Sequence, residues 1–313
     1  MRQPLKTDDA APLRTARRIL IVRLRSLGDC VLATPAIHLL KTSRPDAQIA
    51  VIVEPAWRAV YEGNPDISAI LPPSHTAIWN FAPDVVIDFH GGNTAARLTF
   101  LSRAEYRAGF GHYKRRAAYN IRIPRAQQIL DVDRTVHTAE HMASAIFYLG
   151  IDPQPIPRAQ LYAAPADPAR APYAIIHPVA ATPEKTWPAA NFLRLADHLR
   201  CQYQLEPVFI AAQDQDLSPF SRFSTVAGAP LQDLKTLISG ATLFLGNDSG
   251  PAHIAAAFGV PPIVIFGPSD PVIWGPWNTP GEVIKADGPI TAVNPDHVIA
   301  AVDRIQAGMR VPA

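Results

Sequence analysis

The sequence has little cysteine and no long uninterrupted apolar run. Its two cysteines, Cys30 and Cys201, are too few and too far apart for a disulfide scaffold or a cysteine-ligated structural zinc site, and they fit a reducing cytoplasm. The most apolar stretch, residues 251–268, is interrupted by a histidine, a glycine and two adjacent prolines, so no transmembrane helix is predicted. The apolar run that begins at Ile19 ends at Arg23, so no signal peptide is predicted either.

Several motifs of well-known enzyme classes are absent or incomplete. The chain has no Walker loop, and residues 109–111 lack the third glycine of a dinucleotide fingerprint. Ser249 is followed at once by Gly250, which does not fit a nucleophile elbow. Residues 137–141 match the short zinc-peptidase pattern H-x-x-E-H, but this pattern is common by chance and no third ligand can be placed. We therefore predict neither a metal site nor a cofactor.

The charge of the chain is close to balanced but unevenly divided. Met1 to Gln160 carries 20 Lys+Arg against 14 Asp+Glu, and the remainder carries 9 against 13. Between Arg103 and Arg125, seven cations accompany one acid, Glu105. Such a run is either a solvated face or a site for an anionic substrate or a membrane surface. Nucleic acid is not expected, because the run has no reading helix and the overall charge is near neutral.

Short apolar runs alternate with helical patterns in two series, which is typical of α/β proteins. Successive Val and Ile residues suit strands covered on both faces, as in a parallel sheet. Residues 152–172 separate the two series and hold six prolines, too many for a helix or a central strand. The predicted strands are 19–24, 48–53, 84–89, 173–177, 207–211, 242–246 and 262–266, and the predicted helices are 29–42, 138–149, 188–203, 231–239, 249–258 and 294–306.

With 313 residues, of which 48% are apolar, the chain has enough material for about two domains with buried cores. We predict an α/β fold with two doubly wound, Rossmann-like domains, residues 1–160 and 161–313, that face each other across a cleft. Residues 1–18 are expected to be poorly ordered, and the last helix could pack back on the first domain. Ligands of such sheets bind beyond the carboxyl ends of the strands, so a site is expected in the strand-to-helix turns.

The first of these turns contains Gly28 and Asp29. Gly28 permits a tight turn after the first strand, and Asp29 opens the next helix. Asp29 is either only an N-cap, worth about 1 kcal/mol, or a general base that accepts the proton of a substrate hydroxyl. Its position alone leaves both interpretations open.

The turn from Gly246 to His253 also joins a strand to a helix. Backbone N–H groups from Ser249 onward would point at a ligand, and the positive end of the helix suits a phosphate. Asp248 is either a helix cap or a carboxylate that holds sugar hydroxyls. His253 in the first helical turn is either packed or functional.

The loop HPVAATPEKTWP, from His177 to Pro188, contains Lys185. A loop lysine is usually only solvated, but beside the helix start at Ser249 it could neutralise a diphosphate leaving group. Trp187 is more consistent with core packing or loop anchoring than with stacking on a ligand.

These residues together resemble those of glycosyltransferase family 9, the lipopolysaccharide heptosyltransferase family. The resemblance runs from about Ile19 to Trp277 and is carried by ILIVRLRSLGDCVLATPAIHLLK (19–41), by the loop HPVAATPEKTWP, by His137 with Glu140, and most specifically by PLQDLKTLISGATLFLGNDSGPAHIAAAFGVPPIVIFGPSDP (230–271). It implies a GT-B architecture and an inverting transfer without a metal-binding DxD site. It also implies an ADP-heptose donor bound by the C-terminal domain and an anionic lipopolysaccharide inner-core acceptor held by the N-terminal domain.

The resemblance assigns roles to residues that match the family's motifs. Asp29 matches the general base, and Lys185 matches a lysine that contacts the donor's phosphate and sugar. We place donor binding at Thr182, Asp216, Asp248, Ser249, Gly250 and His253, and acceptor binding at Arg23, Arg25, Arg115 and Arg116. The sequence departs from the family twice: Arg25 stands where a small residue is usual, and Asp216 is the best substitute for a glutamate that holds the ribose.

We therefore predict an inverting glycosyltransferase that transfers heptose from ADP-heptose to the lipopolysaccharide inner core. One alternative is a GT-B enzyme that uses another nucleotide sugar or another glycan acceptor. A second alternative is a non-catalytic protein that binds a nucleotide sugar. The predicted location is cytoplasmic, with peripheral attachment to the cytoplasmic face of the inner membrane as an option, and no stable protein partner is expected.

Overall fold

The computed structural model describes residues 11–310, and the chain divides into two compact units, Met1–Tyr162 and Ala163–Ala313. Residues 1–10 of the segment expected to be poorly ordered lie outside the described part of the chain. The remainder of that segment is ordered, since Pro12–Arg14 form a short 3₁₀ helix and Leu13 is fully buried. The backbone N–H of Leu13 donates to the carbonyl of Leu149 at 3.1 Å, which ties this segment to the first unit.

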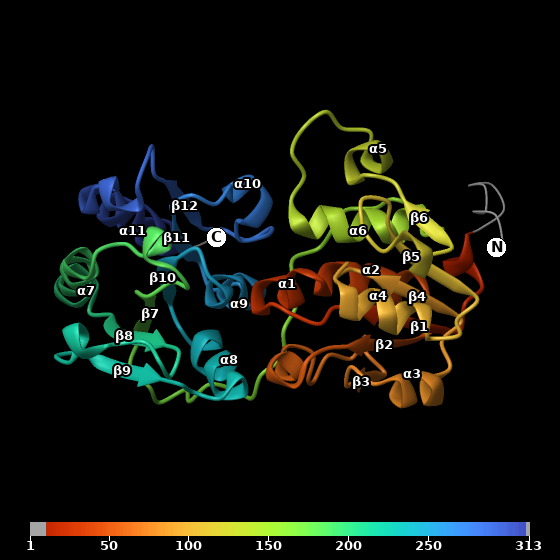
Figure 1. Cartoon of the computed structure of the whole chain (residues 1–313). Helices are drawn as coiled ribbons and strands as arrows, with labels where there is room; N and C mark the ends of the chain where they lie inside the picture. The colour runs from red at the N-terminus through yellow and green to blue at the C-terminus, as the bar shows by residue number, and fades with distance from the viewer. Residues whose placement is uncertain (1–10, 311–313) are drawn as a thin grey trace. The chain divides into compact units, whose positions relative to one another are not determined.

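The first unit contains a six-stranded parallel sheet of order β3-β2-β1-β4-β5-β6 (Figure 1). The order reverses between β1 and β4, where Val22 lies opposite Asp88. The sheet forms here because its central strands are short runs of Ile, Leu and Val that are buried on both faces. Its strands are β1 (Arg18–Val22), β2 (Gln48–Ile52), β3 (Ala69–Leu71), β4 (Val85–Asp88), β5 (Tyr106–Phe110) and β6 (Ile121–Ile123).

Helices cover both faces of this sheet. Leu20 and Val22 of β1 pack in one apolar cluster with Ile78 of α3 and Leu98 of α4, while α2 and α6 pack against each other. The helices are α1 (Leu27–Leu32), α2 (Thr34–Ser43), α3 (His75–Phe81), α4 (Asn93–Phe100), α5 (Ala126–Leu130) and α6 (Thr138–Tyr148).

The single helix predicted over residues 29–42 is wrong, because the chain forms α1 and α2 with a break at Ala33. Pro35 has no N–H to donate to the carbonyl of Val31, and the hydroxyl of Thr34 donates to that carbonyl instead at 2.8 Å. The break ends α1 after six residues.

The second unit repeats the architecture with the order β12-β11-β10-β7-β8-β9, again all parallel (Figure 1). Its strands are β7 (Tyr173–His177), β8 (Glu206–Ala211), β9 (Ser224–Ala227), β10 (Leu243–Asn247), β11 (Pro262–Phe266) and β12 (Glu282–Lys285), and its helices are α7 (Ala189–Tyr203), α8 (Leu231–Ser239), α9 (Gly250–Phe258), α10 (Pro271–Trp274) and α11 (Pro295–Arg310). Residues 152–172 contain no helix or strand, as their prolines predicted.

The core of the second unit lies between its sheet and the pair α7 and α11. Phe192 of α7 and Val298 of α11 belong to one apolar cluster with Phe209 of β8 and Ile265 of β11. The last helix therefore packs on α7 and β11 of its own unit. On this evidence from packing and topology, the predicted α/β class with two parallel, doubly wound sheets is confirmed.

Candidate active site

In the first unit, polar side chains gather where the strand order reverses between β1 and β4. Such a reversal leaves a crevice at the carboxyl ends of the strands, where α/β proteins bind their ligands. Arg23 follows β1 directly, and Asp88 and His90 stand at the end of β4. Asp29 lies in the first turn of α1. The sequence motif therefore places Asp29 at the edge of the sheet where a site is expected.

Asp29 is held by side chains and does not cap its helix. The N-cap position is Ser26, whose hydroxyl donates to Asp29 Oδ2 at 3.1 Å. The Arg23 guanidinium forms an ion pair with the same oxygen. Within residues 11–310, Asp29 Oδ1 has no hydrogen-bond partner. The carboxylate therefore has one oxygen fixed by the protein and one available to another group.

Arg23 was predicted to bind an acceptor; its guanidinium contacts Phe89 through Nη1 and Asp29 through Nη2, while Nε has no hydrogen-bond partner among the described residues. Its side chain is buried, and Nη1 donates to the carbonyl of Phe89 at 2.6 Å. Cys30, one turn into α1, is also buried, with Sγ 3.9 Å from the Arg23 carbonyl. Burial raises the pKa of the Cys30 thiol to about 12, so it stays neutral. Arg23 is therefore placed to orient Asp29 rather than to meet solvent.

Asp88 is a fully buried carboxyl group that the sequence analysis did not single out. It accepts hydrogen bonds from the hydroxyl of Tyr119 at 2.7 Å and from the backbone N–H groups of His90 at 2.7 Å and Gly91 at 2.9 Å. Burial raises its pKa, while these donors oppose the change. The signal in the sequence was an acid at the end of the apolar run VVID, where a core strand would carry another aliphatic residue.

The imidazole rings of His141 and His90 lie near the charge of Arg23. The ring of His141 stacks on Phe110 with 3.8 Å between centroids, and burial lowers the pKa of His141 to about 4. Burial and the charges of Arg23 and Arg25 lower the pKa of His90. Both histidines are therefore neutral at pH 7. The sequence analysis noted residue 141 only as part of a zinc-peptidase pattern.

Residues 137–141, which match the zinc-peptidase pattern, form the start of helix α6. His137 is the N-cap of α6, its Nδ1 accepts from the N–H of Ala139 at 3.1 Å, and Glu140 accepts from the N–H of His137 at 2.8 Å. Glu140 also pairs with Arg134 at 2.6 Å. These contacts make a capping box. Among residues 11–310, no group of three or more His, Cys, Asp or Glu side chains is arranged to hold a metal ion.

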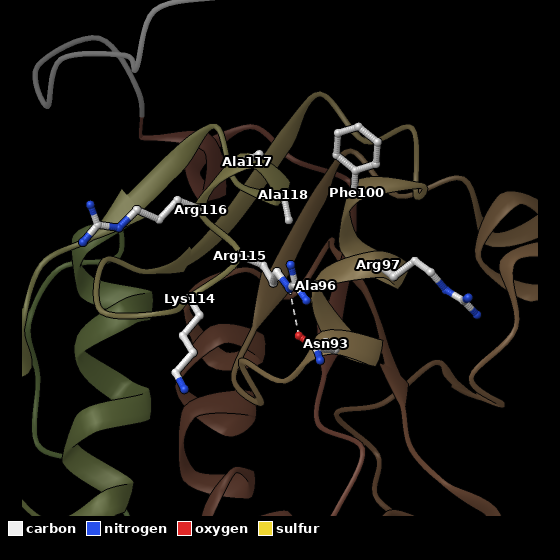
Figure 2. A pocket seen from close by; sticks show the side chains of 9 residues that line it. All are labelled: Asn93, Ala96, Arg97, Phe100, Lys114, Arg115, Arg116, Ala117 and Ala118. Carbon is white, nitrogen blue, oxygen red and sulfur yellow. Dashed lines mark hydrogen bonds between the residues drawn. The ribbon is translucent and has the colours of Figure 1, made fainter.

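The other predicted acceptor residues are exposed. Arg25 follows β1, and Arg115 and Arg116 lie beside a surface pocket of about 720 Å³. Figure 2 shows the Arg115 side chain turned toward Asn93, to whose Oδ1 it donates at 2.9 Å, and the Arg116 side chain extending away from the pocket. The structure thus joins Arg23 to Asp29 but leaves Arg115 and Arg116 on the surface.

In the second unit, the strand order reverses between β7 and β10, and the loops after these two strands meet. Lys185 Nζ, from the loop after β7, lies 2.9 Å from Asp248 Oδ2, at the end of β10. About a third of the Lys185 side chain is exposed and Asp248 is nearly buried. Thr182 precedes the same short 3₁₀ helix, Pro183–Lys185. Two predicted donor-binding residues are therefore in direct contact.

Asn247 holds this arrangement together. Its side chain is fully buried, with Oδ1 accepting from the backbone N–H of Trp187 at 3.0 Å and Nδ2 donating to the Pro178 carbonyl at 2.8 Å. Trp187 is fully buried and donates through Nε1 to the carbonyl of Val293 at 3.0 Å. Trp187 anchors the loop, as predicted. The role of Asn247 was missed, although a buried amide ending an apolar strand is the kind of residue that fixes a neighbouring loop.

Within the described part of the chain, the beginning of α9 has no side-chain cap. Ser249 is its N-cap residue, but the Ser249 hydroxyl makes no cap hydrogen bond and lies 2.9 Å from Nδ1 of His177. His177 is buried and its pKa falls to about 4, so the ring is neutral at pH 7. Pro251, in the first turn, has no N–H to satisfy. The N–H of Ala252 donates to the Ser249 carbonyl at 3.2 Å, so the N–H of Gly250 and the positive helix end are the features that suit a phosphate.

Close packing beneath this helix start requires glycine at position 246. A Cβ atom there would lie 2.9 Å from the His177 carbonyl oxygen. Gly246 therefore lets β10 approach β7 and brings His177 to Ser249. His253 is buried on α9, in the same helix as Gly250.

Asp216 has its own local partner. It follows β8, and its carboxylate accepts from the N–H of Ser218 at 2.8 Å and from the Ser218 hydroxyl at 2.9 Å. These hydrogen bonds lower the pKa of Asp216. Among the described residues no contact joins Asp216 to the Lys185–Asp248 pair. Its assignment to the ribose stays a prediction.

Two parallel six-stranded sheets, each with polar groups at its strand-order reversal, are the architecture of the GT-B fold. Comparison with known proteins specifies the family. The model of glycosyltransferase family 9 (heptosyltransferase) matches residues 77–292, more than half of the chain. The chain belongs to this family and is a glycosyltransferase.

Individual proteins agree with this assignment. The chain is 27% identical over 293 residues to lipopolysaccharide heptosyltransferase 3 of Escherichia coli, covering 82% of this chain and 85% of that protein. Its fold is similar to a glycosyl transferase family 9 structure from Veillonella parvula, with a TM-score of 0.81, 20% identity and coverage of 93% and 97%. It is also similar to E. coli heptosyltransferase WaaC solved with ADP, with a TM-score of 0.75, 17% identity and coverage of 92% and 99%.

Proposed function

We propose that this protein is an inverting transferase that moves heptose from ADP-heptose to the inner core of lipopolysaccharide. The observation that carries the proposal is the contact of Lys185 with Asp248 beside the uncapped start of α9. A lysine and a helix N-terminus together form a cradle for a diphosphate. The names of the similar proteins, a lipopolysaccharide heptosyltransferase and a heptosyltransferase solved with ADP, support the choice of sugar and nucleotide.

In the proposed reaction, a hydroxyl oxygen of the acceptor attacks the anomeric carbon of the donor sugar. The bond from that carbon to the diphosphate oxygen breaks, and its electron pair leaves with ADP. The hydroxyl proton passes to Asp29, and attack from the face opposite the leaving group inverts the anomeric configuration. A general base of this kind contributes roughly 10²- to 10⁴-fold to the rate.

The contacts of Asp29 fit the role of base. Arg23 and Ser26 both bind Oδ2 and so fix the orientation of the carboxylate. Oδ1 is then the oxygen that accepts the proton. Arg23 acts through Asp29 and is a positioning residue in this proposal, which replaces its predicted contact with the acceptor.

The donor would be held by the second unit. Lys185 and the N–H of Gly250 at the start of α9 would bind the diphosphate, whose negative charge grows as the bond breaks. Asp248 and Thr182 have oxygens suited to sugar hydroxyls. We also assign Ser249, Gly250 and His253 to the donor site. Residues 161–313 are the donor-binding domain in this proposal, and residues 1–160 the acceptor-binding domain.

The acceptor is anionic in this proposal, and basic groups of the first unit would bind it. Arg25, Arg115 and Arg116 are exposed and can meet phosphate or carboxylate groups. No helix among residues 11–310 has the length and hydropathy needed to span a bilayer. We place the protein in the cytoplasm, in reach of acceptors at the inner membrane surface.

A second candidate function is transfer from a different nucleotide sugar. The changed ribose segment permits it, because Asp216 stands where the family has a glutamate and its carboxylate already accepts two hydrogen bonds from Ser218. A thermal-shift series with ADP, UDP and GDP separates the candidates. Stabilisation by ADP alone supports the first, and stabilisation by UDP or GDP instead of ADP would overturn it. Release of ADP from ADP-heptose only when acceptor is added then tests transfer itself.

A further inference from the structure

The first unit has an exposed apolar patch on two neighbouring helices. Trp79 of α3 is 40% exposed, and Phe100 and Leu101 at the end of α4 are 55% and 38% exposed. The indole N–H of Trp79 donates to the Leu101 carbonyl at 2.7 Å, which joins α3 to the end of α4, and Phe100 is the preceding residue on α4. Single exposed apolar residues are ordinary, but a patch of large ones marks an interaction surface.

Unpaired cations surround this patch. The Arg103 guanidinium lies 4.3 Å from the centre of the Trp79 ring, and Arg97 lies one turn before Phe100 on α4. The pocket beside Phe100 is lined by further cations, and Figure 2 shows Arg97, Lys114 and Arg116 extending outward from it. From Arg97 to Arg125 the sequence holds eight Lys+Arg and one acid, Glu105.

Among the described residues these cations have no acidic partners, whereas several surface arginines of the second unit do. Arg194, Arg200, Arg222 and Arg304 of the second unit each form an ion pair with an Asp or Glu. Within residues 11–310, no carboxylate lies within ion-pair distance of Arg97, Arg103, Lys114, Arg115 or Arg116. Their charge is therefore available to an external anion.

We infer that the patch of Trp79, Phe100 and Leu101 and its rim of Arg97, Arg103 and Lys114 dock the protein on a bilayer of anionic phospholipids. Aromatic side chains suit the boundary between headgroups and acyl chains, and arginine binds phosphate through paired N–H groups. Charge complementarity selects the occupant, because the segment from Arg97 to Arg125, with eight cations and one acid, matches a uniformly negative surface.

Another apolar patch in the molecule provides a matched control. Val272 and Trp274 of α10 are 53% and 39% exposed, similar to the patch in the first unit. Residues 270–292 around them hold one cation, Lys285, and three acids. Lys285 donates to backbone carbonyls and so is not free. Val272 and Trp274 therefore provide an exposed apolar patch whose sequence neighbourhood, residues 270–292, has no free cation.

The experiment is co-sedimentation of the full chain with vesicles that contain neither donor nor acceptor. Phosphatidylcholine vesicles are compared with vesicles of phosphatidylcholine and phosphatidylglycerol. We expect binding to the anionic vesicles only, and weaker binding as salt is raised. Arg97→Glu should weaken binding by about fivefold or more. Phe100→Ser should weaken it roughly tenfold through lost apolar contact, and Val272→Ser should leave it unchanged.

Three results would overturn the inference: no binding to anionic vesicles, equal binding to neutral vesicles, or wild-type binding by both Arg97→Glu and Phe100→Ser. If the chain binds no vesicles but binds an acidic protein, and Arg97→Glu weakens that binding, the surface would be assigned to a protein partner instead. The inference extends the proposed function, because a lipopolysaccharide acceptor is itself in a membrane. ADP binding measured on the same samples reports the donor site separately, so the two proposals can fail independently.

Discussion

Arg23 and Asp29 form an ion pair in which both side chains are largely withdrawn from solvent, 9% and 19% exposed. Coulombic attraction is stronger there than on an open surface, and the loss of one partner leaves the other charge buried. The pair therefore links the stability of the first unit to the orientation of the proposed base. A substitution at either residue is therefore expected to change both the stability of the first unit and the orientation of the proposed base.

Asp29→Asn should abolish most turnover while leaving ADP binding intact. The amide keeps an oxygen for Arg23 and Ser26 but cannot accept a proton at neutral pH. We expect the rate of ADP release with acceptor to fall by about 10²- to 10⁴-fold. The unfolding temperature should also fall, because Arg23 loses its counter-charge.

Asp29→Glu separates the two effects, since it restores the charge and moves the base by one methylene. Calorimetry with ADP checks that the second unit is intact in both variants. Turnover of Asp29→Asn close to that of the wild type would remove Asp29 from the role of base.

Lys185→Ala should weaken ADP binding by roughly 10- to 100-fold, as expected for a lost hydrogen bond between two charged groups. The matched variant is Asp248→Asn, which removes the carboxylate that holds Lys185 and leaves the lysine. We expect Asp248→Asn to bind ADP as well as the wild type, or better, and to lose affinity for the sugar nucleotide relative to ADP. Isothermal calorimetry with ADP and with the sugar nucleotide measures these affinities for the wild type and both variants. Equal ADP affinity of Lys185→Ala and the wild type would contradict the proposed diphosphate site.

Acid should destabilise both units through buried histidines. His141 and His177 have pKa values of about 4 in the folded chain and about 6.5 when unfolded. Their neutral forms therefore contribute stability that is fully present above pH 6.5 and is lost as the pH falls through 4, up to about 3 kcal/mol for each. Urea unfolding between pH 7 and pH 4 measures the slope. His177→Asn should flatten it for the second unit, and a slope equal to that of the wild type would refute this account.

Gly246→Ala should destabilise the second unit by about 1–3 kcal/mol, because the new methyl group meets the His177 carbonyl at 2.9 Å. Gly308→Ala is the control, since a Cβ there has nothing within 4 Å and alanine favours the helix. Chemical denaturation of both variants checks the prediction. A Gly246→Ala protein as stable as the wild type would show that β10 and β7 can separate at no cost.

The sequence predicted the central elements of the fold and missed the edge strands together with the inner strand β5. Strands β7 and β11 have the predicted bounds because their apolar runs are fully buried. Helix α8 has them because Pro230 precedes it and Gly240 follows it. Strands β9 and β12 were missed because their side chains alternate or are mostly exposed, and such edge strands carry no continuous apolar signal. They form strands because β9 pairs with β8 and β12 pairs with β11, and such pairing cannot be predicted from the local sequence.

The candidate site shows the same limit. Asp29, Lys185 and Asp248 could be chosen because each lies in a turn after an apolar strand, where local sequence indicates position. Arg23 was chosen for its charge, but its burial against Phe89 depends on β4, 66 residues away. Contacts such as that between Arg23 and Phe89 join residues that the sheet brings together from distant parts of the chain, so local sequence patterns do not predict them.

The two thiols of the chain differ in accessibility. Cys201 on α7 is exposed, whereas Cys30 is buried beside Arg23 with its pKa raised to about 12. A maleimide dye should therefore label the native protein once, on the second unit, without any engineered cysteine. The second thiol becomes reactive only when the first unit opens, so the labelling stoichiometry would serve as a built-in gauge of its unfolding.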